Sequence, residues 1–327
     1  MSNLRVGLVG LGMMGQNHAR VLANLDGVEF VGVCDPAGEV KGNAQGRKVV
    51  STLDELIAMK IDYAMVAIPT VYHLETGLML AEAGINALIE KPLAHDIDSA
   101  EKLTAAFKKA NLIGAVGYIE RFNPALQEAR KRIDQLGTLH QVVTRRQGPF
   151  PARISDVGVV KDLATHDVDL TAWVTGQDYI NVSARTSFKS GREFEDMVAV
   201  IATLSDGTIS NHLVNWLSPI KERVTIITGE KGSFVVDTLT ADLTFYSNGK
   251  VSSDWDAVSR FRGVSEGDVT RYAFTKKEPL RLEHESFRDA ILGKKSDIVT
   301  LEEGLATVNV VEAIIKSAKT LETVELN

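Results

Sequence analysis

The stretch LRVGLVGLGMMGQNHARVLANL, residues 4–25, decides the fold because it joins a strand pattern to a helix pattern through three glycines. The apolar, partly β-branched run at residues 4–10 is typical of a parallel strand that is buried on both faces. Residues 16–25 are helix-like. Between them, Gly10, Gly12 and Gly15 have the spacing G-x-G-x-x-G, which permits a tight turn, a close approach of the backbone to a pyrophosphate and close packing of helix on strand.

The residues after the glycines favour a dinucleotide site. A phosphate is expected on the free N–H groups at the start of the helix, where Met13 and Met14 stand. The next strand-like run, VEFVGVCD at 28–35, ends at Asp35, twenty residues beyond Gly15. A carboxylate there accepts hydrogen bonds from both ribose hydroxyls of NAD and repels the 2′-phosphate of NADP. We therefore predict NAD as the cofactor, with NADP as the alternative. Asp35 could also be a turn residue before Pro36, and this role is compatible with ribose binding.

Strand and helix patterns alternate over the rest of the first third. Strands are expected at 61–69, 86–90 and 112–118, and helices at 49–60, 72–84 and 97–110. This alternation predicts a doubly wound parallel sheet of the Rossmann type, which binds ligands at the carboxyl ends of its strands. Two strand ends carry candidate cofactor residues, which are Pro69 and Thr70 with His73, and Glu90 with Lys91.

Lys91 lies between Glu90 and Pro92, directly after the strand at 86–90. Because a residue before proline is kept extended, Pro92 would direct the ammonium group at the ligand edge of the sheet. The alternative is an ordinary charged surface turn. His18 is expected to be structural or solvent-facing, and no role is assigned to His284.

Length and composition limit the class of protein. A chain of 327 residues that is 44% hydrophobic predicts two domains. A net charge of −7 argues against nucleic acid as a partner, since phosphate binding needs a basic surface. The single cysteine, Cys34, excludes an internal disulfide and a cysteine zinc cluster. We read no secretory signal and no apolar run of about 20 residues, and so expect a cytoplasmic protein without membrane contact.

The second part of the chain has a different pattern. Strand-like runs occur at 139–149, 179–188, 197–216, 222–237 and 243–250, with hairpin-type turns at Asp206-Gly207 and Asn248-Gly249. Helical patterns return at 283–293 and 301–320. We predict a Rossmann domain at 1–121 and, at 122–327, an α+β domain built on a mostly antiparallel open sheet.

A helix in this second domain carries a candidate catalytic pair. It is expected from about Lys161 to Gly176, and it sets Asp162 and His166 four residues apart, on one face. A carboxylate one turn from an imidazole can hold its tautomer and raise its basicity, as a general base requires. The alternatives are an exposed pair without function and a zinc site that includes Asp169; no metal is predicted.

These motifs together resemble the Gfo/Idh/MocA oxidoreductases over essentially the whole chain. The resemblance implies that Lys91, Asp162 and His166 form a catalytic triad at a secondary alcohol, and that the segment IPTVYH, residues 68–73, passes along the cofactor. It also implies a homodimer or homotetramer. In the segment VGYIERFNPA, residues 116–125, we place Arg121 at the cofactor, and Tyr118 and Asn123 at the substrate.

Two segments resemble one branch of that family more closely. VGYIERFNPA and VVKDLATHDVDL, residues 159–170, are similar to the branch that contains UDP-N-acetylglucosamine 3-dehydrogenases, although that branch usually has histidine where this chain has Tyr118. The implied reaction is hydride transfer between a sugar or nucleotide-sugar hydroxyl carbon, at the 3-position, and nicotinamide. The alternatives are an inositol or free-sugar dehydrogenase and a non-catalytic NAD-binding regulator. Candidate partners for a substrate phosphate are Arg145, Arg146, Arg153 and Lys161.

Overall fold

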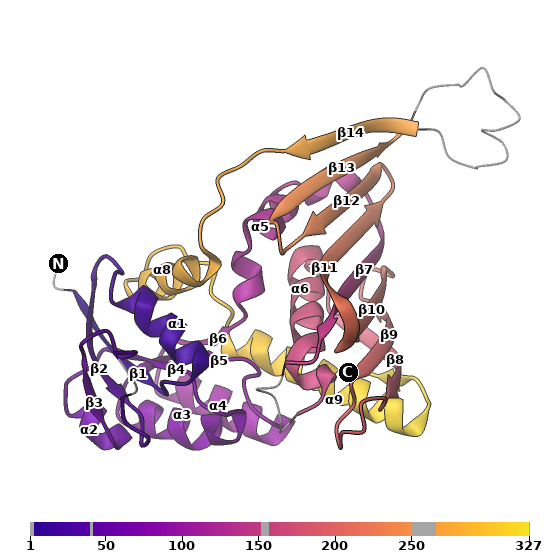
Figure 1. Cartoon of the computed structure of the whole chain (residues 1–327). Coiled ribbons are helices and arrows are strands. Elements are labelled where there is room, and N and C mark those ends of the chain that lie inside the picture. The colour runs from indigo at the N-terminus through magenta and orange to yellow at the C-terminus, as the bar shows by residue number, and fades with distance from the viewer. Residues whose placement is uncertain (1–2, 40–41, 152–156, 250–265, 327) are drawn as a thin grey trace, which may run out of the picture. The chain divides into compact units, whose positions relative to one another are not determined.

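The chain forms two compact units in the computed structural model, which describes residues 3–39, 42–151, 157–249 and 266–326 (Figure 1). Unit 1 comprises residues 1–122 and 277–309, and unit 2 comprises residues 123–276 and 310–327. The first segment of unit 1 ends at residue 122, close to the change in sequence pattern. Residues 277–309, which follow much later in the sequence, also pack in unit 1. No helix among the described residues is long and apolar enough to cross a membrane.

Unit 1 contains a six-stranded sheet in which every neighbouring pair is parallel. Its strands stand in the order β3-β2-β1-β4-β5-β6. Their bounds are β1 Leu4–Val9, β2 Val28–Cys34, β3 Lys48–Val50, β4 Tyr63–Val66, β5 Asn86–Glu90 and β6 Gly114–Gly117. Because β1 lies between β2 and β4, the strand order reverses there, which is where such sheets bind ligands. The predicted doubly wound Rossmann sheet is confirmed.

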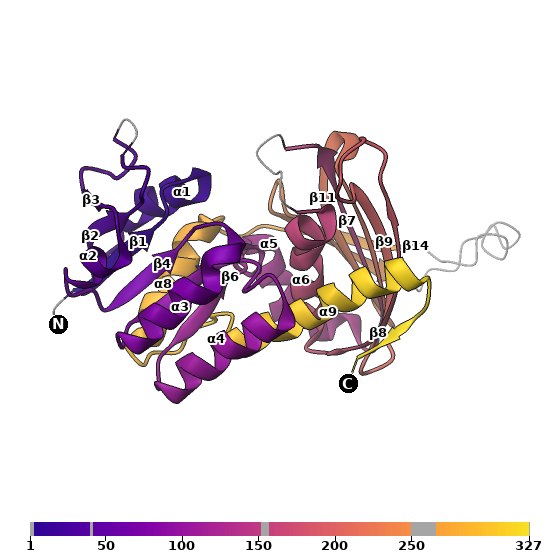
Figure 2. The same ribbon diagram turned by 90° about the horizontal axis from the view of Figure 1, so that it is seen from below.

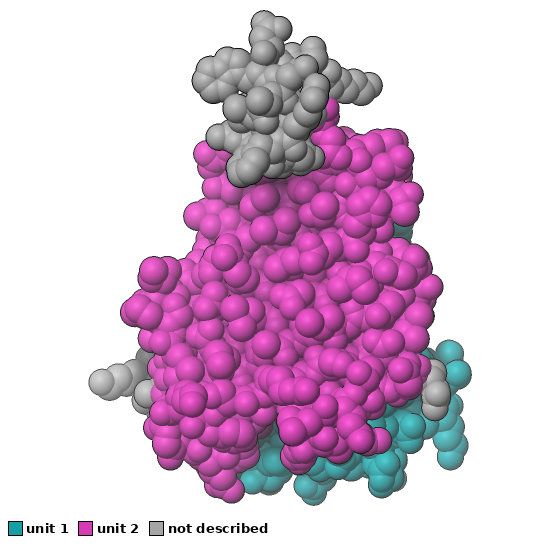
Figure 3. Space-filling model, turned by 90° about the vertical axis from the view of Figure 1, so that its right-hand side faces the viewer, with its two compact units in different colours: residues 1–122, 277–309 teal, residues 123–276, 310–327 magenta. Residues whose placement is uncertain are grey.

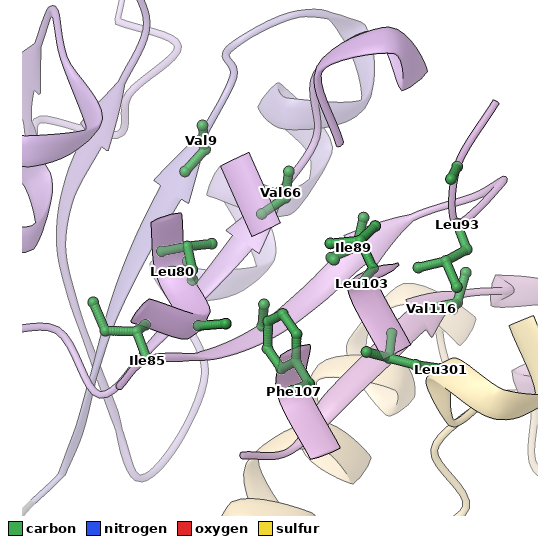
Figure 4. Packing of buried hydrophobic residues seen from close by; sticks show 14 of the residues in the cluster. Val9, Val66, Leu80, Ile85, Ile89, Leu93, Leu103, Phe107, Val116 and Leu301 are labelled. Carbon is green, nitrogen blue, oxygen red and sulfur yellow. The ribbon is translucent and has the colours of Figure 1, made fainter. Parts of the chain in front are cut away.

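Successive side chains of a strand point to opposite faces of the sheet, and in this sheet both faces are apolar. Helices therefore cover both faces. On one face, Val9, Val66 and Ile89 pack with Leu80 of α3 and Leu103 of α4 (Figure 4). The other face packs against α1 and α8 (Figure 2). The helix bounds are α1 Met13–Leu22, α3 His73–Glu82, α4 Ile97–Lys109 and α8 Pro279–Ile291, with short 3₁₀ turns η1 Thr70–Tyr72 and η2 Ile119–Phe122.

The helix predicted at 49–60 is shorter in the structure. Val49 and Val50 belong to β3, which pairs with β2, and the helix α2 spans Leu53–Ile57. The hydroxyl of Thr52 accepts the N–H of Glu55, and the Glu55 carboxylate accepts the N–H of Thr52 in return. This capping box makes Thr52 the N-cap of α2. The two valines favour the strand because β-branched side chains fit a pleated sheet.

Unit 2 contains a nine-stranded sheet in the order β14-β13-β12-β11-β7-β10-β9-β8-β15. Every neighbouring pair is antiparallel except β7 and β10, so the predicted mostly antiparallel sheet is confirmed. Asp206-Gly207 connects β9 to β10 as expected, whereas the chain after Asn248-Gly249 leaves the described residues until β14. The bounds are β7 Leu139–Pro149, β8 Tyr179–Ser187, β9 Met197–Leu204, β10 Ile209–Asn215, β11 Leu217–Gly229, β12 Gly232–Asp237, β13 Asp242–Asn248, β14 Glu266–Tyr272 and β15 Val324–Glu325.

Helices cover one face of this second sheet. Leu126 of α5 and Trp173 of α6 pack on the sheet, as do residues of α9 from Val310 onward. The opposite face carries exposed apolar residues; Ile201 is 56% exposed and Val269 is 61% exposed. Figure 3 shows the surface of unit 2 in magenta. The bounds are α5 Pro124–Lys131, a 3₁₀ turn η3 Ile133–Leu136, a π-helical turn Val160–Ala164, α6 Thr165–Thr175 and α9 Leu301–Thr320.

Removing the side-chain cap of α2 tests the assignment of Thr52 as its N-cap. Thr52→Ala is expected to lower the free energy of unfolding of unit 1 by about 1 kcal/mol, because the Glu55 N–H loses its acceptor. Urea unfolding followed by circular dichroism measures the change. Ser51→Ala is the matched control, since Ser51 is exposed and contacts Glu55 through its backbone N–H. An equal cost in both variants would contradict the assignment.

Candidate active site

The turn between β1 and α1 depends on glycine at position 10. Gly10 has φ of +94°, and its N–H donates to the carbonyl of Cys34 at 2.8 Å. A Cβ at this position would lie 2.4 Å from the carbonyl oxygen of Ala67. The positive φ and the close approach of β4 each exclude a larger residue, so Gly10 makes the tight turn that the motif predicts.

Gly12 and Gly15 differ in what surrounds them. A Cβ on Gly15 would lie 2.1 Å from the carbonyl oxygen of Gly10, so the close packing of α1 on the turn requires glycine there. A Cβ on Gly12 would meet no heavy atom within 4 Å. Gly12 is the N-cap of α1, and no side chain caps this helix. The open space and the uncapped N–H groups at Met13 and Met14 fit an anionic group such as the pyrophosphate of NAD.

Asp35 stands beside the same turn, at the end of β2. One carboxylate oxygen accepts the N–H of Leu11 at 2.7 Å, and the other accepts the N–H of Ala37 at 2.9 Å. The carboxylate is therefore held in one orientation next to the glycine turn. This is the position from which an acid can accept hydrogen bonds from the ribose hydroxyls of a dinucleotide.

His73 connects the loops that follow β4 and β5. Its side chain is fully buried; Nε2 lies 3.0 Å from the carbonyl oxygen of Ile68, and Nδ1 lies 3.1 Å from that of Pro92. Burial lowers the pKa of His73, although the neighbouring carbonyls act in the opposite direction. Pro69, which is exposed, and Thr70, which is half-buried, follow Ile68 directly. The imidazole thus holds the Pro69-Thr70 loop against the Lys91-Pro92 loop.

Glu90 is buried at the end of β5, and both of its carboxylate oxygens are engaged. Oε1 lies 2.9 Å from Nε2 of His18, and Oε2 accepts the N–H of Lys91 at 3.1 Å. Burial raises the pKa of Glu90, but His18 and Lys91 together lower it by more, so the pKa lies below its usual value. The backbone of Lys91, which is half-buried, is therefore held by a charged carboxylate.

His18 has a role at this site that the sequence did not reveal. It is fully buried on α1, so the expectation of a solvent-facing residue is wrong and that of a structural one is confirmed. A signal was present, because His18 stands three residues after Gly15 and so shares the helix face that packs on the turn.

Three further candidates from residues 118–123 are buried. Tyr118 is fully buried in the core of unit 1. The guanidinium group of Arg121 donates to Glu303 of α9 at 2.6 Å. Asn123, in unit 2, is the N-cap of α5; its amide oxygen accepts the N–H of Ala125, and its amide nitrogen donates to the carbonyl of Thr238, both at 3.0 Å. Asn123 thus holds the start of a helix, and Arg121 holds α9 against the segment after β6.

Asp162 and His166 stand where the helix of unit 2 begins. Asp162 is 7% exposed and lies in the π-helical turn Val160–Ala164, and His166 is 9% exposed in the first turn of α6. The predicted end at Gly176 is confirmed, with φ of +69°. The regular helical start was not found, because a π-helical turn replaces it. Such turns are frequent at functional sites.

Glu195 holds the start of this turn, although no motif in the sequence indicates it. Its backbone carbonyl accepts the N–H of Val159 at 3.0 Å, and its carboxylate accepts the N–H of Val160 at 3.1 Å. A Cβ on Gly158 would lie 2.0 Å from the Glu195 carboxyl group, so a larger residue there would displace this carboxylate. Glu195 is 33 residues from Asp162, and a local pattern does not show such a contact.

The candidate phosphate-binding residues in unit 2 form ion pairs. Arg145 lies 2.8 Å from Glu222, Lys161 lies 2.7 Å from Glu312, and Arg146 contacts both oxygens of Asp167 at 3.1 Å. The Arg146–Asp167 pair is buried, so breaking it would leave an uncompensated charge. Arg153 lies outside the described residues.

The structure thus brings Gly10, Gly12, Gly15 and Asp35 together in unit 1, and it places Glu90 and Lys91 at the end of a strand of the same sheet. Asp162, His166 and Asn123 belong to unit 2. Among the described residues, no group of three or more histidine, cysteine or acidic side chains could hold a metal ion.

Comparison with known proteins defines the class first. Residues 4–118 match the description "Oxidoreductase family, NAD-binding Rossmann fold", and residues 131–326 match "Oxidoreductase family, C-terminal alpha/beta domain". The protein is an NAD-binding oxidoreductase that acts on CH–OH groups. The chain belongs to the Gfo/Idh/MocA family, as its motifs suggested.

Individual relatives cover nearly the whole chain. It is 30% identical over 295 residues to UDP-N-acetylglucosamine 3-dehydrogenase from Acidithiobacillus ferrooxidans, covering 89% of this chain and 90% of that protein. The solved structure of that enzyme superimposes with a TM-score of 0.85 at 25% identity, over 98% of this chain and 99% of the other. The scyllo-inositol 2-dehydrogenase (NAD⁺) of Bacillus subtilis is 26% identical, covering 94% of this chain and 93% of that enzyme.

The different surroundings of Gly12 and Gly15 give a test of the cofactor site. Gly12→Ala is expected to leave the melting temperature without NAD unchanged, because its Cβ points into open space, but to weaken NAD binding at least tenfold. Gly15→Ala is expected to destabilise the protein by about 1–3 kcal/mol, because its Cβ meets a backbone oxygen. Thermal unfolding with and without NAD measures both effects. Wild-type NAD affinity in Gly12→Ala would contradict the site.

Proposed function

We propose that this protein is an NAD-dependent dehydrogenase that oxidises the 3-hydroxyl of a sugar nucleotide similar to UDP-N-acetylglucosamine, in a reversible reaction. The observation that carries the proposal is the 30% identity, over 89% of the chain, to an enzyme of that activity. The motif residues Lys91, Asp162 and His166 support it, because a dehydrogenase needs groups that manage a proton, whereas an NAD-binding regulator does not.

Three side chains would carry the chemistry. NAD, when bound, accepts the hydride. His166 accepts the proton of the substrate hydroxyl, with Asp162 holding its tautomer. Lys91 donates a hydrogen bond to the substrate oxygen and stabilises the negative charge that develops there. This mechanism requires that Lys91 of unit 1 and His166 of unit 2 meet at one carbinol.

The buried positions of the polar residues support this assignment. Asp162 and His166 are both more than nine-tenths buried, and burial strengthens any electrostatic interaction between them and a ligand. The backbone of Lys91 is held by Glu90, so its side chain starts from a fixed point. We place Tyr118 and Asn123 near the substrate, and Arg121, Pro69, Thr70 and His73 along the cofactor.

An inositol or free sugar is the second candidate substrate. The similarity to scyllo-inositol 2-dehydrogenase favours it, since that match covers 94% of the chain. Tyr118 is a further reason, because the nucleotide-sugar branch resembled by this chain usually has histidine there. The ion pairs of Arg145, Arg146 and Lys161 also favour it, because a substrate phosphate would have to compete with Glu222, Asp167 and Glu312.

We also propose that the protein works in the cytoplasm as a homodimer or homotetramer. The exposed apolar residues on the helix-free face of the second sheet, including Ile201, Tyr246 and Val269, support self-association. A second copy of the chain would cover this face and remove its apolar surface from water.

Loss of the proposed base gives the direct test of the mechanism. His166→Asn is expected to lower turnover by about 10²–10⁴-fold, the usual contribution of general acid–base catalysis, while NAD affinity stays near normal. Lys91→Met is expected to lower kcat as well, because the substrate oxygen loses its charged donor. Initial rates of nicotinamide reduction measure both, with His140→Asn, an exposed histidine of β7, as the control. Turnover in His166→Asn within a few-fold of wild type would contradict the proton-transfer role.

The same assay distinguishes the candidate substrates. UDP-N-acetylglucosamine, free N-acetylglucosamine, scyllo-inositol and myo-inositol are offered in turn with NAD and with NADP. The first proposal predicts the largest kcat/KM with the nucleotide sugar and NAD. A larger value with an inositol would favour the second candidate, and tight NAD binding without any turnover would contradict both.

The self-association proposal predicts a particle that is a multiple of the 35.6 kDa chain in sedimentation velocity. Ile201→Lys is expected to shift the population toward the monomer, because it puts a charge on the apolar face. Glu101→Lys, on the exposed surface of α4, is the control. A wild-type protein that sediments as a monomer at micromolar concentration would contradict the proposal.

A further inference from the structure

A chain of buried polar side chains runs through unit 1 and ends at Lys91. Nε2 of His284, on α8, lies 2.8 Å from Nδ1 of His18, on α1. Nε2 of His18 lies 2.9 Å from Oε1 of Glu90, and Oε2 of Glu90 accepts the N–H of Lys91 at 3.1 Å. The two histidines are fully buried and Glu90 is 9% exposed. Three elements that are distant in sequence thus meet at the backbone of one proposed catalytic residue.

The direction of the hydrogen bond between His18 and Glu90 follows from the ionised state of Glu90. An ionised carboxylate only accepts hydrogen bonds, so Nε2 of His18 carries the proton that it shares with Glu90. Nδ1 of His18 and Nε2 of His284 share the next hydrogen bond, in which either ring can be the donor. Burial, together with His18, lowers the pKa of His284 well below its usual value, which keeps His284 neutral. Hydrogen bonds therefore connect α8 through α1 to the end of β5.

Glu283, next to His284 on α8, shows that only one carboxylate in this region is charged. It is 2% exposed, and neither of its carboxyl oxygens has a hydrogen-bond partner among the described residues. Burial and the charge of Glu90 raise the pKa of Glu283 well above its usual value. Glu283 is therefore neutral and Glu90 is ionised. Neighbouring carboxyl groups with pKa values pushed apart are characteristic of functional sites.

Stability alone does not explain this cluster. Burying two imidazoles and a carboxylate costs desolvation free energy, and apolar side chains of similar volume could fill the same space at lower cost. Hydrogen bonds on both ring nitrogens of His18 instead fix the orientation of its imidazole, because an alternative rotamer breaks them. The group whose orientation is fixed at the end of this polar chain is the Glu90 carboxylate, and through it the amide of Lys91.

We propose that His18 and His284 are positioning residues for Lys91. They hold the Glu90 carboxylate ionised and in one orientation, so that it fixes the backbone from which the lysine side chain reaches the ligand edge of the sheet. This inference rests on the proposed role of Lys91 in the reaction. Because His18 is on α1, whose N-cap is Gly12, this helix connects the dinucleotide turn to Glu90 and so to the backbone of Lys91.

The proposal predicts how activity depends on pH. Glu90 faces His18 from α1, Glu283 and His284 from α8, His73 from α3, and Lys91 beside it in sequence. The pKa of Glu90 is depressed, so its carboxylate persists as the pH falls until that low pKa is reached. Without the donor at His18 the pKa of Glu90 rises, and the carboxylate is lost at a higher pH. The acid limb of the kcat profile should then move to higher pH.

The experiment compares His18→Leu with His18→Gln in the full-length protein, using NAD and the best substrate from the screen above. His18→Leu is expected to lower kcat at pH 7 and to move the acid limb upward by about one to two pH units, the size expected for losing a hydrogen bond to a charged group. KM for NAD should change less than kcat. His18→Gln keeps an N–H donor toward Glu90, so it should restore most of kcat and the wild-type acid limb.

A matched control comes from another buried histidine. His212, in unit 2, is fully buried and hydrogen-bonded to Thr144 and Tyr179. His212→Leu is expected to lower the melting temperature without moving the acid limb, which separates positioning from general destabilisation. If His18→Leu does not fold, His284→Leu carries the test, with a shift in the same direction.

The outcomes separate this inference from the proposed function. If Lys91→Met loses activity but the His18 and His284 variants keep the wild-type acid limb and kcat, the positioning role is wrong and the role of Lys91 stands. If Lys91→Met keeps its turnover, both are wrong. An acid limb that moves equally in His212→Leu would also contradict the positioning role.

Discussion

A charged carboxylate cannot be buried at the end of a strand unless donors are brought to it, and the arrangement of unit 1 around Glu90 follows from this constraint. The side-chain donor comes from α1 and is supported from α8, which begins 157 residues after the end of unit 1's first segment. The return of residues 277–309 to the first sheet therefore brings a polar group to the site as well as apolar cover for a helix. The buried carboxylate in turn accepts the N–H of Lys91 and so holds the backbone at that residue.

Unit 2 handles a similar requirement by different means. Asp162 and His166 are buried at a helix start, and the backbone there widens into a π-helical turn. Glu195 accepts the N–H groups of Val159 and Val160 at the start of that turn, so these two groups do not need water or a ligand as a partner. In each unit, a carboxyl group thus holds the backbone near the proposed catalytic residues. Glu90 accepts the N–H of Lys91 in unit 1, and Glu195 accepts the N–H of Val160 in unit 2. In the proposed reaction, unit 1 contributes the cofactor and a charged donor, and unit 2 contributes the base.

The family and the substrate depend on different kinds of residue. The glycine turn and the parallel sheet define the cofactor-binding class, because a dinucleotide makes the same demands on any protein that binds it this way. Substrate choice within the family depends on a few side chains at one site, which fold alone does not specify. This is why the proposed nucleotide-sugar and inositol substrates share one fold and one reaction.

Local pattern was sufficient for what depends on neighbouring residues. The spacing of Gly10, Gly12 and Gly15, the alternation of strands with helices and the cap at Gly176 each reflect sterics or hydrogen bonds within a few residues. Sequence by itself therefore determined the Rossmann sheet, the mostly antiparallel second sheet and the family. Tertiary structure alone decided the contacts of His18, which joins Glu90 across 72 residues and His284 across 266. It also decided the position of Val49 in a strand, the π-helical turn before His166 and the hold of Glu195 on that turn. These features depend on which distant groups are available to satisfy a buried polar atom, and only the folded chain brings those groups together.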